Sequence, residues 1–215
     1  MLSDRLFFPL LILVLGLIIY AAFKYGPSVS ATQSPLSGDP MAGFLIEGAD
    51  LRLIDSGPNL VRELINDPEE GYFVRSTAGA PLIKNPASAG IFLAMLPDIG
   101  MAWSGQTIHV AVELRQSAIN PSSDVIVRYY AVGRGNGPVT PCAVSKQWQT
   151  CYMTYKVRLS DNPPNLSFVG IWPDTKGLGR YVDMRSMEIR INQPIKKPIQ
   201  DQQIPDLSQD SATNN

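Results

Sequence analysis

The feature that most constrains the fold is a run of alternating polar and apolar residues between Gln106 and Arg158. In Q-T-I-H-V-A-V-E-L-R-Q and again in D-V-I-V-R-Y-Y-A-V, apolar residues recur at every second position, which is the period of a β-strand with one face in a core. A Gly-rich turn follows, and then C-A-V-S-K-Q-W-Q-T-C-Y-M-T-Y-K-V-R. The run predicts three or four strands, with Cys142 and Cys151 on the last hairpin.

Similar short runs, bounded by turn residues, occupy the rest of the central region. The strand candidates are 44–54, 71–77, 90–96, 106–116, 124–132, 139–145, 148–159, 166–172 and 180–191, with Gly48 marking a bulge in the first. Only Asn59–Asn66 has helical spacing, with Leu60 and Leu64 on one side. The pattern predicts an all-β antiparallel sandwich of about eight or nine strands with one short helix.

The alternation also assigns faces to the central strands. Ile108, Val110, Val112 and Leu114 fall on one side of their strand, and we expect them in the core. The outer face of the same sheet is then expected to carry His109, Glu113, Arg115, Arg128 and Tyr130. This polar face is a candidate binding surface.

Length and charge limit the number of domains and the kinds of partner that the chain can have. At 215 residues, 45% of them hydrophobic and 17% charged, the chain is long enough for one domain of about 150 residues with appendages. We place the folded domain at residues 41–192. The net charge of −1 leaves no basic excess to neutralise phosphates, so nucleic acid is not an expected partner.

The N-terminal appendage is apolar. Leu6 to Phe23 contains no charged residue, and roughly 18 to 20 apolar residues in a helix span a bilayer. Residues 1–25 are therefore expected to form a single uncleaved transmembrane anchor. A cleaved signal peptide, with Val29-Ser30-Ala31 at the cleavage site, is the alternative, but its apolar region is usually only about 7 to 15 residues long.

The other appendages are polar. Residues 26–40 are rich in Pro, Ser and Gly and predict a flexible linker, and residues 193–215 predict a disordered tail. Cys142 and Cys151 are the only cysteines, and close spacing beyond a membrane segment favours a disulfide in an oxidising compartment over two buried thiols. We therefore expect a single-pass protein of the inner membrane, with its domain on the periplasmic or extracellular side.

Several segments of the domain together resemble a known family. They are A-W-S-G-Q-T-I-H-V-A-V-E-L-R, D-V-I-V-R-Y-Y, Lys146 to Thr150, Leu166 to Pro173 and the closing Tyr181 to Ile189. In this order they are similar to the jelly-roll carbohydrate-binding modules and other galactose-binding-like sandwiches, over about Gly90 to Ile191. The resemblance implies a jelly-roll sandwich and a glycan ligand, although the matched set of exposed aromatics that forms a sugar platform is not evident.

The candidate ligand-binding residues follow from this resemblance and from the polar face. They are Trp103, Trp148 and Trp172, which as aromatics suit a sugar ring, together with His109, Arg128 and Tyr130. Each has a structural alternative: a tryptophan in such a sandwich is more often core, and Arg128 with Glu113 is more often an ion pair on a solvated face. His109 is the only histidine, and no second metal ligand accompanies it.

Neither catalysis nor a cofactor is predicted. The sequence shows no assembled set of acid, base and nucleophile, so we expect no enzyme. The loop of Asp174, Lys176, Gly177 and Gly179 has one carboxylate, which is too few to argue for a structural calcium. Two function classes stay open: a membrane-tethered glycan-binding module of the cell envelope, serving polysaccharide synthesis or export, or an assembly subunit whose sandwich docks another envelope protein.

Overall fold

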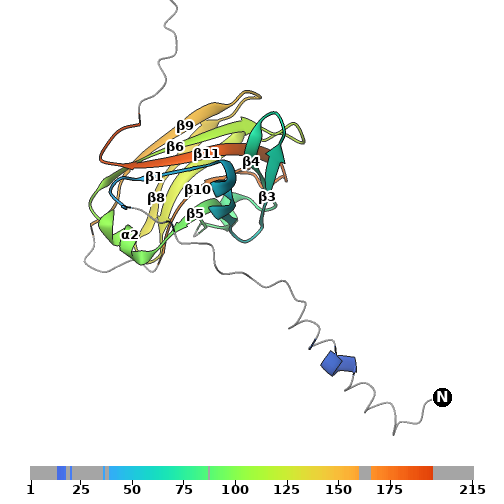
Figure 1. The fold of residues 1–215 in the computed structure, drawn as a ribbon, viewed down its shortest axis with the longest axis horizontal. Coiled ribbons are helices and arrows are strands. Elements are labelled where there is room, and N and C mark those ends of the chain that lie inside the picture. Colours follow the sequence, from blue (N-terminus) through green and yellow to red (C-terminus); the bar gives the residue numbers. More distant parts are fainter. Residues whose placement is uncertain are drawn as a thin grey trace, which may run out of the picture. The chain divides into compact units, whose positions relative to one another are not determined.

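The computed structural model describes residues 14–17, 20, 36, 39–86, 88–159 and 166–195. The chain divides into one unit up to Pro35 and a second from Leu36 onward, and the second contains the folded domain (Figure 1). Residues 14–17 and 20 are helical. Within the described residues, no helix combines the length and the apolar character needed to cross a membrane. Most of the predicted anchor, linker and tail lies outside the described residues.

The domain is built from short strands joined by turns. In chain order the elements are β1 (Phe44–Glu47), η1 (Gly48–Leu53), β2 (Ile54–Ser56), β3 (Leu60–Asp67), β4 (Gly71–Ala78), η2 (Leu82–Lys84), β5 (Ile91–Met95), α2 (Pro97–Ala102), β6 (Thr107–Gln116), β7 (Asp124–Ala131), β8 (Gly135–Ala143), β9 (Gln149–Lys156), β10 (Ser167–Trp172) and β11 (Tyr181–Ile191).

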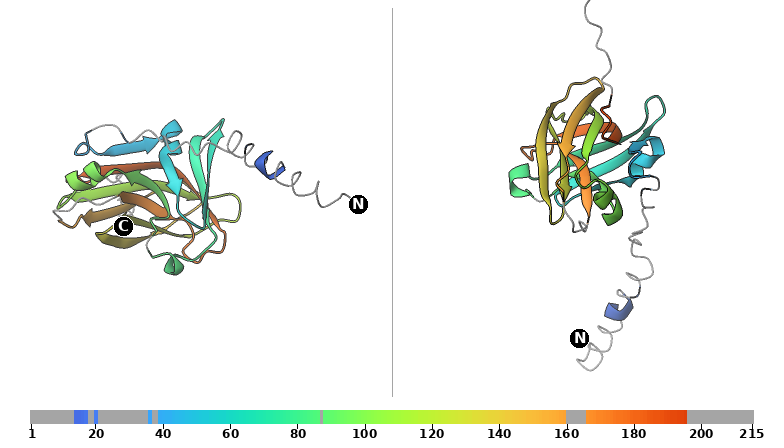
Figure 2. Two further views of the ribbon diagram at one scale, coloured as in Figure 1. Left: turned by 90° about the horizontal axis from the view of Figure 1, so that it is seen from below. Right: turned by 90° about the vertical axis from the view of Figure 1, so that its left-hand side faces the viewer.

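The strands form two antiparallel sheets packed face to face (Figures 1 and 2). One has six strands, in the order β3-β4-β11-β6-β9 with β1 also pairing with β11, and the other has five, in the order β2-β5-β10-β7-β8. The predicted all-β antiparallel sandwich is therefore confirmed. The strand count is higher than expected in part because 44–54 is interrupted: Gly48, at φ 57°, starts the 3-10 helix η1 between β1 and β2.

The helix predicted over Asn59–Asn66 is wrong. Leu60 to Asn66 lie in β3, which pairs with β4 from Leu60↔Ala78 to Asp67↔Gly71, and Asn59 lies in the turn before it. A spacing of four residues, as between Leu60 and Leu64, puts two side chains on one face of a strand as well as of a helix, so it does not distinguish the two. The tight turn after Asp67, whose carboxylate accepts hydrogen bonds from the backbone N–H groups of Glu69 and Glu70, turns the chain back to form a hairpin.

The predicted core face of β6 is confirmed. Ile108, Val110, Val112 and Leu114 are at most 1% exposed. They pack between the sheets with inward residues of β11 on their own sheet and of β7 and β10 on the other. Continuous apolar burial between two sheets is the main source of stability in such a sandwich.

The prediction of a single outer face shared by the strands β6 and β7 is wrong. β6 lies in the six-stranded sheet and β7 in the five-stranded sheet, so His109, Glu113 and Arg115 lie on the opposite side of the domain from Arg128 and Tyr130. Alternation shows which side of a strand faces a core. It does not show to which sheet the strand belongs, because the strands of both sheets have the same alternation of inward apolar and outward polar residues.

Cys142 and Cys151 form the expected disulfide. The two strands are not a paired hairpin, however, because β8 is an edge strand of the five-stranded sheet and β9 an edge strand of the six-stranded sheet. Cys142 lies opposite Val125 and Cys151 opposite Val112, and both valines are buried. Both cysteines therefore face inward, and the bond ties the two sheets together at one edge.

Candidate functional site

Three aromatic side chains lie next to one another on the outer face of the five-stranded sheet. Phe92 comes from β5, Phe168 from the central strand β10 and Tyr130 from β7, opposite Phe168 in register. The Tyr130 and Phe168 rings are stacked, with centroids 6.0 Å apart at 17°, and Phe92 meets Phe168 edge-on at 4.8 Å. All three are partly exposed. A strand places alternate side chains on one face, so adjacent strands can align such rings.

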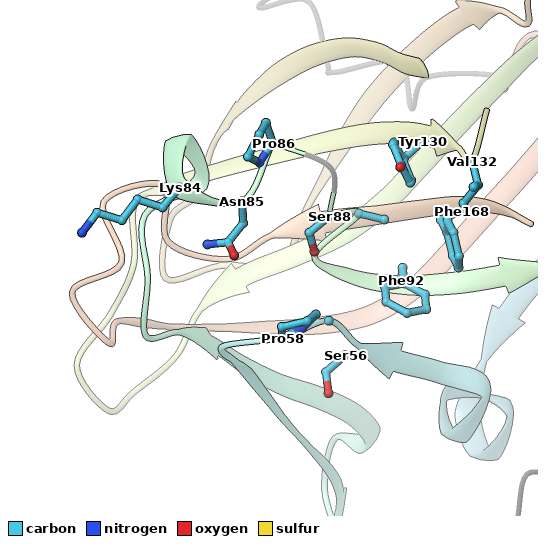
Figure 3. A pocket seen from close by; sticks show the side chains of 12 residues that line it. Ser56, Pro58, Lys84, Asn85, Pro86, Ser88, Phe92, Tyr130, Val132 and Phe168 are labelled. Atoms are coloured by element: carbon cyan, nitrogen blue, oxygen red, sulfur yellow. The ribbon is translucent and has the colours of Figure 1, made fainter. Parts of the chain in front are cut away.

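A cavity of about 580 Å³ lies over these rings (Figure 3). Besides the aromatics it is lined by Ser56, Gly57, Pro58, Lys84, Asn85, Pro86, Ser88, Ala89 and Val132. Apolar surface with a few hydroxyl, amide and ammonium groups is typical of small-ligand sites, whose volumes run from about 300 to 1,000 Å³.

The cavity exists because residues 79–86 and 88–90, here termed the covering segment, shield only part of the outer face. The segment lies close to β10 at Ala89, because a Cβ on Gly170 would be 2.7 Å from the Ala89 carbonyl oxygen. Leu82 N donates a hydrogen bond to Thr175 O, and Gly57 N donates one to Gly90 O, which attach the segment at both ends. Phe168 and Tyr130 lie beyond the shielded part.

Under the covering segment, outward positions are buried. Trp172 and Arg128 are 0% and 2% exposed, and Trp172 Nε1 has no hydrogen-bond partner. Arg128 Nη2 donates a hydrogen bond to the Pro86 carbonyl at 3.0 Å, and Asn136 Nδ2 donates to the same oxygen at 3.1 Å. Burial lowers the pKa of Arg128, since it disfavours the charged form.

The structure thus separates the six predicted ligand-binding residues. Tyr130 lines the cavity and Arg128 is beneath its wall. Trp103 and Trp172 have no exposed surface, and Trp103 Nε1 donates a hydrogen bond to Pro40 O at 3.0 Å. Trp148 is partly exposed but belongs to the other side of the domain, next to the six-stranded sheet, as does His109.

Trp148 is engaged by charged side chains. The guanidiniums of Arg115 and Arg185 lie 4.3 and 4.8 Å from its ring centroid, and Phe73 contacts it edge-on at 6.2 Å. Such cation–π contacts occupy the ring face that would stack on a sugar. His109 Nδ1 is 3.1 Å from Thr154 Oγ1.

The arginines of this outer face are paired with carboxylates. Asp183 bonds to Arg75 at 2.9 Å and to Arg115 at 3.3 Å, and Arg185 pairs with Glu113. Hydrogen bonds to these carboxylates raise the pKa of Arg75 and of Arg185. The predicted pairing of Arg128 with Glu113 is replaced by that of Arg185, because Arg128 is on the other sheet. The carboxylates of Asp183, Glu113 and Glu70 therefore neutralise the arginines around Trp148.

Metal binding finds no support in the described part of the chain, where no group of three His, Cys, Asp or Glu side chains is placed to hold an ion. In the loop considered for calcium, Asp174 is fully buried and accepts hydrogen bonds from the backbone N–H groups of Lys176, Leu178 and Arg180. Its carboxylate therefore holds the loop itself.

Sequence reasoning missed Phe92 and Phe168. The predicted sugar-stacking residues are all tryptophan or tyrosine, and a phenylalanine in an apolar strand is typical of a buried core position. The alternation does indicate that Phe168 and Tyr130 face outward, because each alternates with residues that are buried between the sheets. Their closeness depends on β10 lying between β5 and β7, which the sequence does not reveal.

Comparison with known proteins identifies the fold. No protein-family profile matches the chain, and no curated protein sequence matches it. Among solved structures, the CBM22 tandem domain of Paenibacillus barcinonensis Xyn10C is similar with a TM-score of 0.52 at 12% identity, over 81% of this chain and 50% of that one. The single xylan-binding CBM22 domain of the same protein has a TM-score of 0.49 at 11% identity, over 70% of this chain and 96% of that one. The predicted resemblance to carbohydrate-binding-module sandwiches is confirmed at the level of the fold.

Proposed function

We propose that this chain is a non-catalytic carbohydrate-binding module, with its glycan site in the cavity over Phe92, Phe168 and Tyr130. The observation that carries the proposal is the row of three partly exposed aromatic rings beneath an open cavity. Aromatic side chains pack on the apolar C–H face of a sugar ring. The carbohydrate-binding modules of similar fold support the class of ligand.

The polar lining supplies the second requirement of a sugar site. Ser56, Asn85 and Ser88 offer hydroxyl and amide groups that both donate and accept hydrogen bonds, as sugar hydroxyls require. Figure 3 places Ser88 between the aromatic group and Asn85, so a ligand stacked on the rings would have polar partners along the cavity.

The proposal includes membrane tethering. The apolar segment Leu6 to Phe23 would hold the domain at the outer surface of the inner membrane, where a disulfide is stable and where envelope polysaccharides are made or exported. A binding module at that place would retain or guide a polysaccharide chain without cleaving it.

A glycan array tests the proposal directly. The full-length chain, purified in a detergent without a sugar headgroup, is expected to bind a subset of polysaccharides above background, and a Phe168→Ala variant is expected to lose that binding. If no glycan is bound while the protein is folded, the glycan function is rejected. Co-purification of one envelope protein with the same preparation would then favour the alternative, an assembly subunit.

A further inference from the structure

The only charged side chain among the described residues that line the cavity is positive. Among its twelve residues Lys84 is cationic and none is a carboxylate. Figure 3 shows Lys84 and Asn85 on one side of the cavity and Phe92, Phe168 and Tyr130 on the other. The Lys84 ammonium group points away from the rings in Figure 3, so a ligand that stacks on the rings meets this charge only where it extends past Asn85.

A second cation lies beneath the wall. Arg128 is 2% exposed, its Nη2 is bonded to the carbonyl of the lining residue Pro86, and its Nε has no hydrogen-bond partner. No ion pair joins Arg128 to any carboxylate of the described residues. On the opposite sheet Arg75, Arg115 and Arg185 are all paired with carboxylates.

An unpaired buried guanidinium is unfavourable. Arginine keeps its proton in proteins, so burial does not neutralise it, and a buried charge is costly unless an opposite charge is near. Asp55 lies opposite Phe92 in register, but its Oδ1 accepts the backbone N–H of Ser56 and the residue does not line the cavity. The positive charge under the cavity is thus left for a ligand to compensate.

We propose that the ligand of this cavity is an acidic glycan, whose sugar units carry a carboxylate or a sulfate group. The sugar rings pack on Phe168 and Tyr130, while the anionic group lies toward Lys84, at the end of the cavity where Pro86 covers Arg128. The inference rests on the proposed function, because it specifies the glycan bound at the same site. Guanidinium and ammonium groups attract carboxylate and sulfate alike.

Matched pairs of glycans that differ only in charge test the proposal. Oligogalacturonate is compared with its methyl ester, and a sulfated galactan with its desulfated form, by calorimetric titration of the full-length chain. We expect the acidic member of at least one pair to bind about tenfold more tightly at low salt, and the preference to shrink as salt rises. Which pair shows the preference identifies the anion.

Substitutions of the cavity cations test whether the preference for acidic glycans arises in this cavity. Lys84→Gln is expected to lower affinity for the acidic glycan severalfold more than affinity for its neutral partner, and Arg128→Gln to do the same provided its circular dichroism is native. Lys156→Gln, an exposed lysine at the end of β9, removes the same charge from the other sheet and is expected to leave both affinities unchanged.

Three outcomes overturn the inference in distinguishable ways. Equal affinity for both members of each pair, or binding to neutral glycans alone, rejects the acidic ligand and leaves the glycan function standing. If none of these four glycans binds and the folded protein also binds nothing on the glycan array, the proposed function and this inference both fail. An acidic preference that Lys84→Gln does not reduce would place the anionic group at another site.

Discussion

Asp183 has no exposed surface, and the guanidiniums of Arg75 and Arg115 flank it from the neighbouring strands β4 and β6. Removing one member of a buried ionic group costs more than the group contributes as a whole, because the remaining charges lose their partner. We expect Asp183→Asn to lower the free energy of unfolding by about 3 kcal/mol, measured by urea denaturation.

The control for Asp183 is an exposed ion pair. Asp50 and Arg52 are 3.7 Å apart with side chains 61% and 69% exposed, and such pairs contribute about 0 to 1 kcal/mol. Asp50→Asn should therefore change stability by no more than about 0.5 kcal/mol. Equal effects of the two substitutions would show that the buried network does not stabilise the six-stranded sheet.

Phe168 is the central ring of the aromatic row, in contact with both Phe92 and Tyr130. We expect Phe168→Ala to weaken binding of the identified glycan at least tenfold, about 1.4 kcal/mol, because the stacking surface is lost. The matched control is Trp148→Ala, which removes a larger ring from the other side of the domain. If Trp148→Ala abolishes binding and Phe168→Ala does not, the site lies on the six-stranded sheet.

At the scale of single residues, the sequence predicts burial well and ligand contact poorly. The alternation of β6 identified its four core side chains because the period of a strand depends only on local geometry. Trp103 and Trp172 were considered for a sugar site and are buried, because their accessibility depends on what covers them. For Trp172 this is the covering segment, which comes from a distant part of the chain.

Among the elements, β10 packs closely at Gly170 against both the covering segment and β5. A Cβ there would be 2.7 Å from the carbonyl oxygen of Ala89 and 2.4 Å from that of Ile91. We expect Gly170→Ala to displace residues 88–91, to destabilise the domain by about 1 to 3 kcal/mol and to weaken glycan binding. Gly79→Ala is the control, since its Cβ would meet only the Asn59 carbonyl oxygen at 3.6 Å. Thermal unfolding and titration of both variants check this, and a Gly170→Ala protein with native stability would contradict the close packing.

The disulfide acts at the same scale, since it joins the edge strands of two sheets. Cys142 and Cys151 are nine residues apart, and closing a loop of that size in the unfolded chain stabilises a protein by about 2 to 3 kcal/mol. The double substitution Cys142→Ser and Cys151→Ser should lower stability by that amount, and reduction of the unchanged protein should do the same. Mass spectrometry before and after reduction checks the bond, and two thiols that alkylate without reduction would contradict it.

The sequence predicted this pair of cysteines but not what they join. Local alternation and turn residues define strands, whereas the order of strands in a sheet follows from contacts between distant segments. For this reason alternation alone does not separate the sheet of β6 from that of β7, and the spacing of Leu60 and Leu64 fits a helix as well as a strand. The aromatic row of the candidate site depends on the same long-range order, which is why the sequence named only one of its three members.

For the whole molecule, the membrane tether and the disulfide make one joint prediction about topology. If Leu6 to Phe23 is an uncleaved anchor, the full-length chain made in a Gram-negative bacterium should stay with the membranes after carbonate extraction, at its unprocessed mass. If the domain lies outside the cytoplasm, protease added to spheroplasts should reach it, and Cys142 and Cys151 should resist alkylation until they are reduced. A soluble product beginning after residue 31 would instead show a cleaved signal peptide. Protection from the protease, together with two free thiols, would place the domain in the cytoplasm and remove an envelope polysaccharide as its partner.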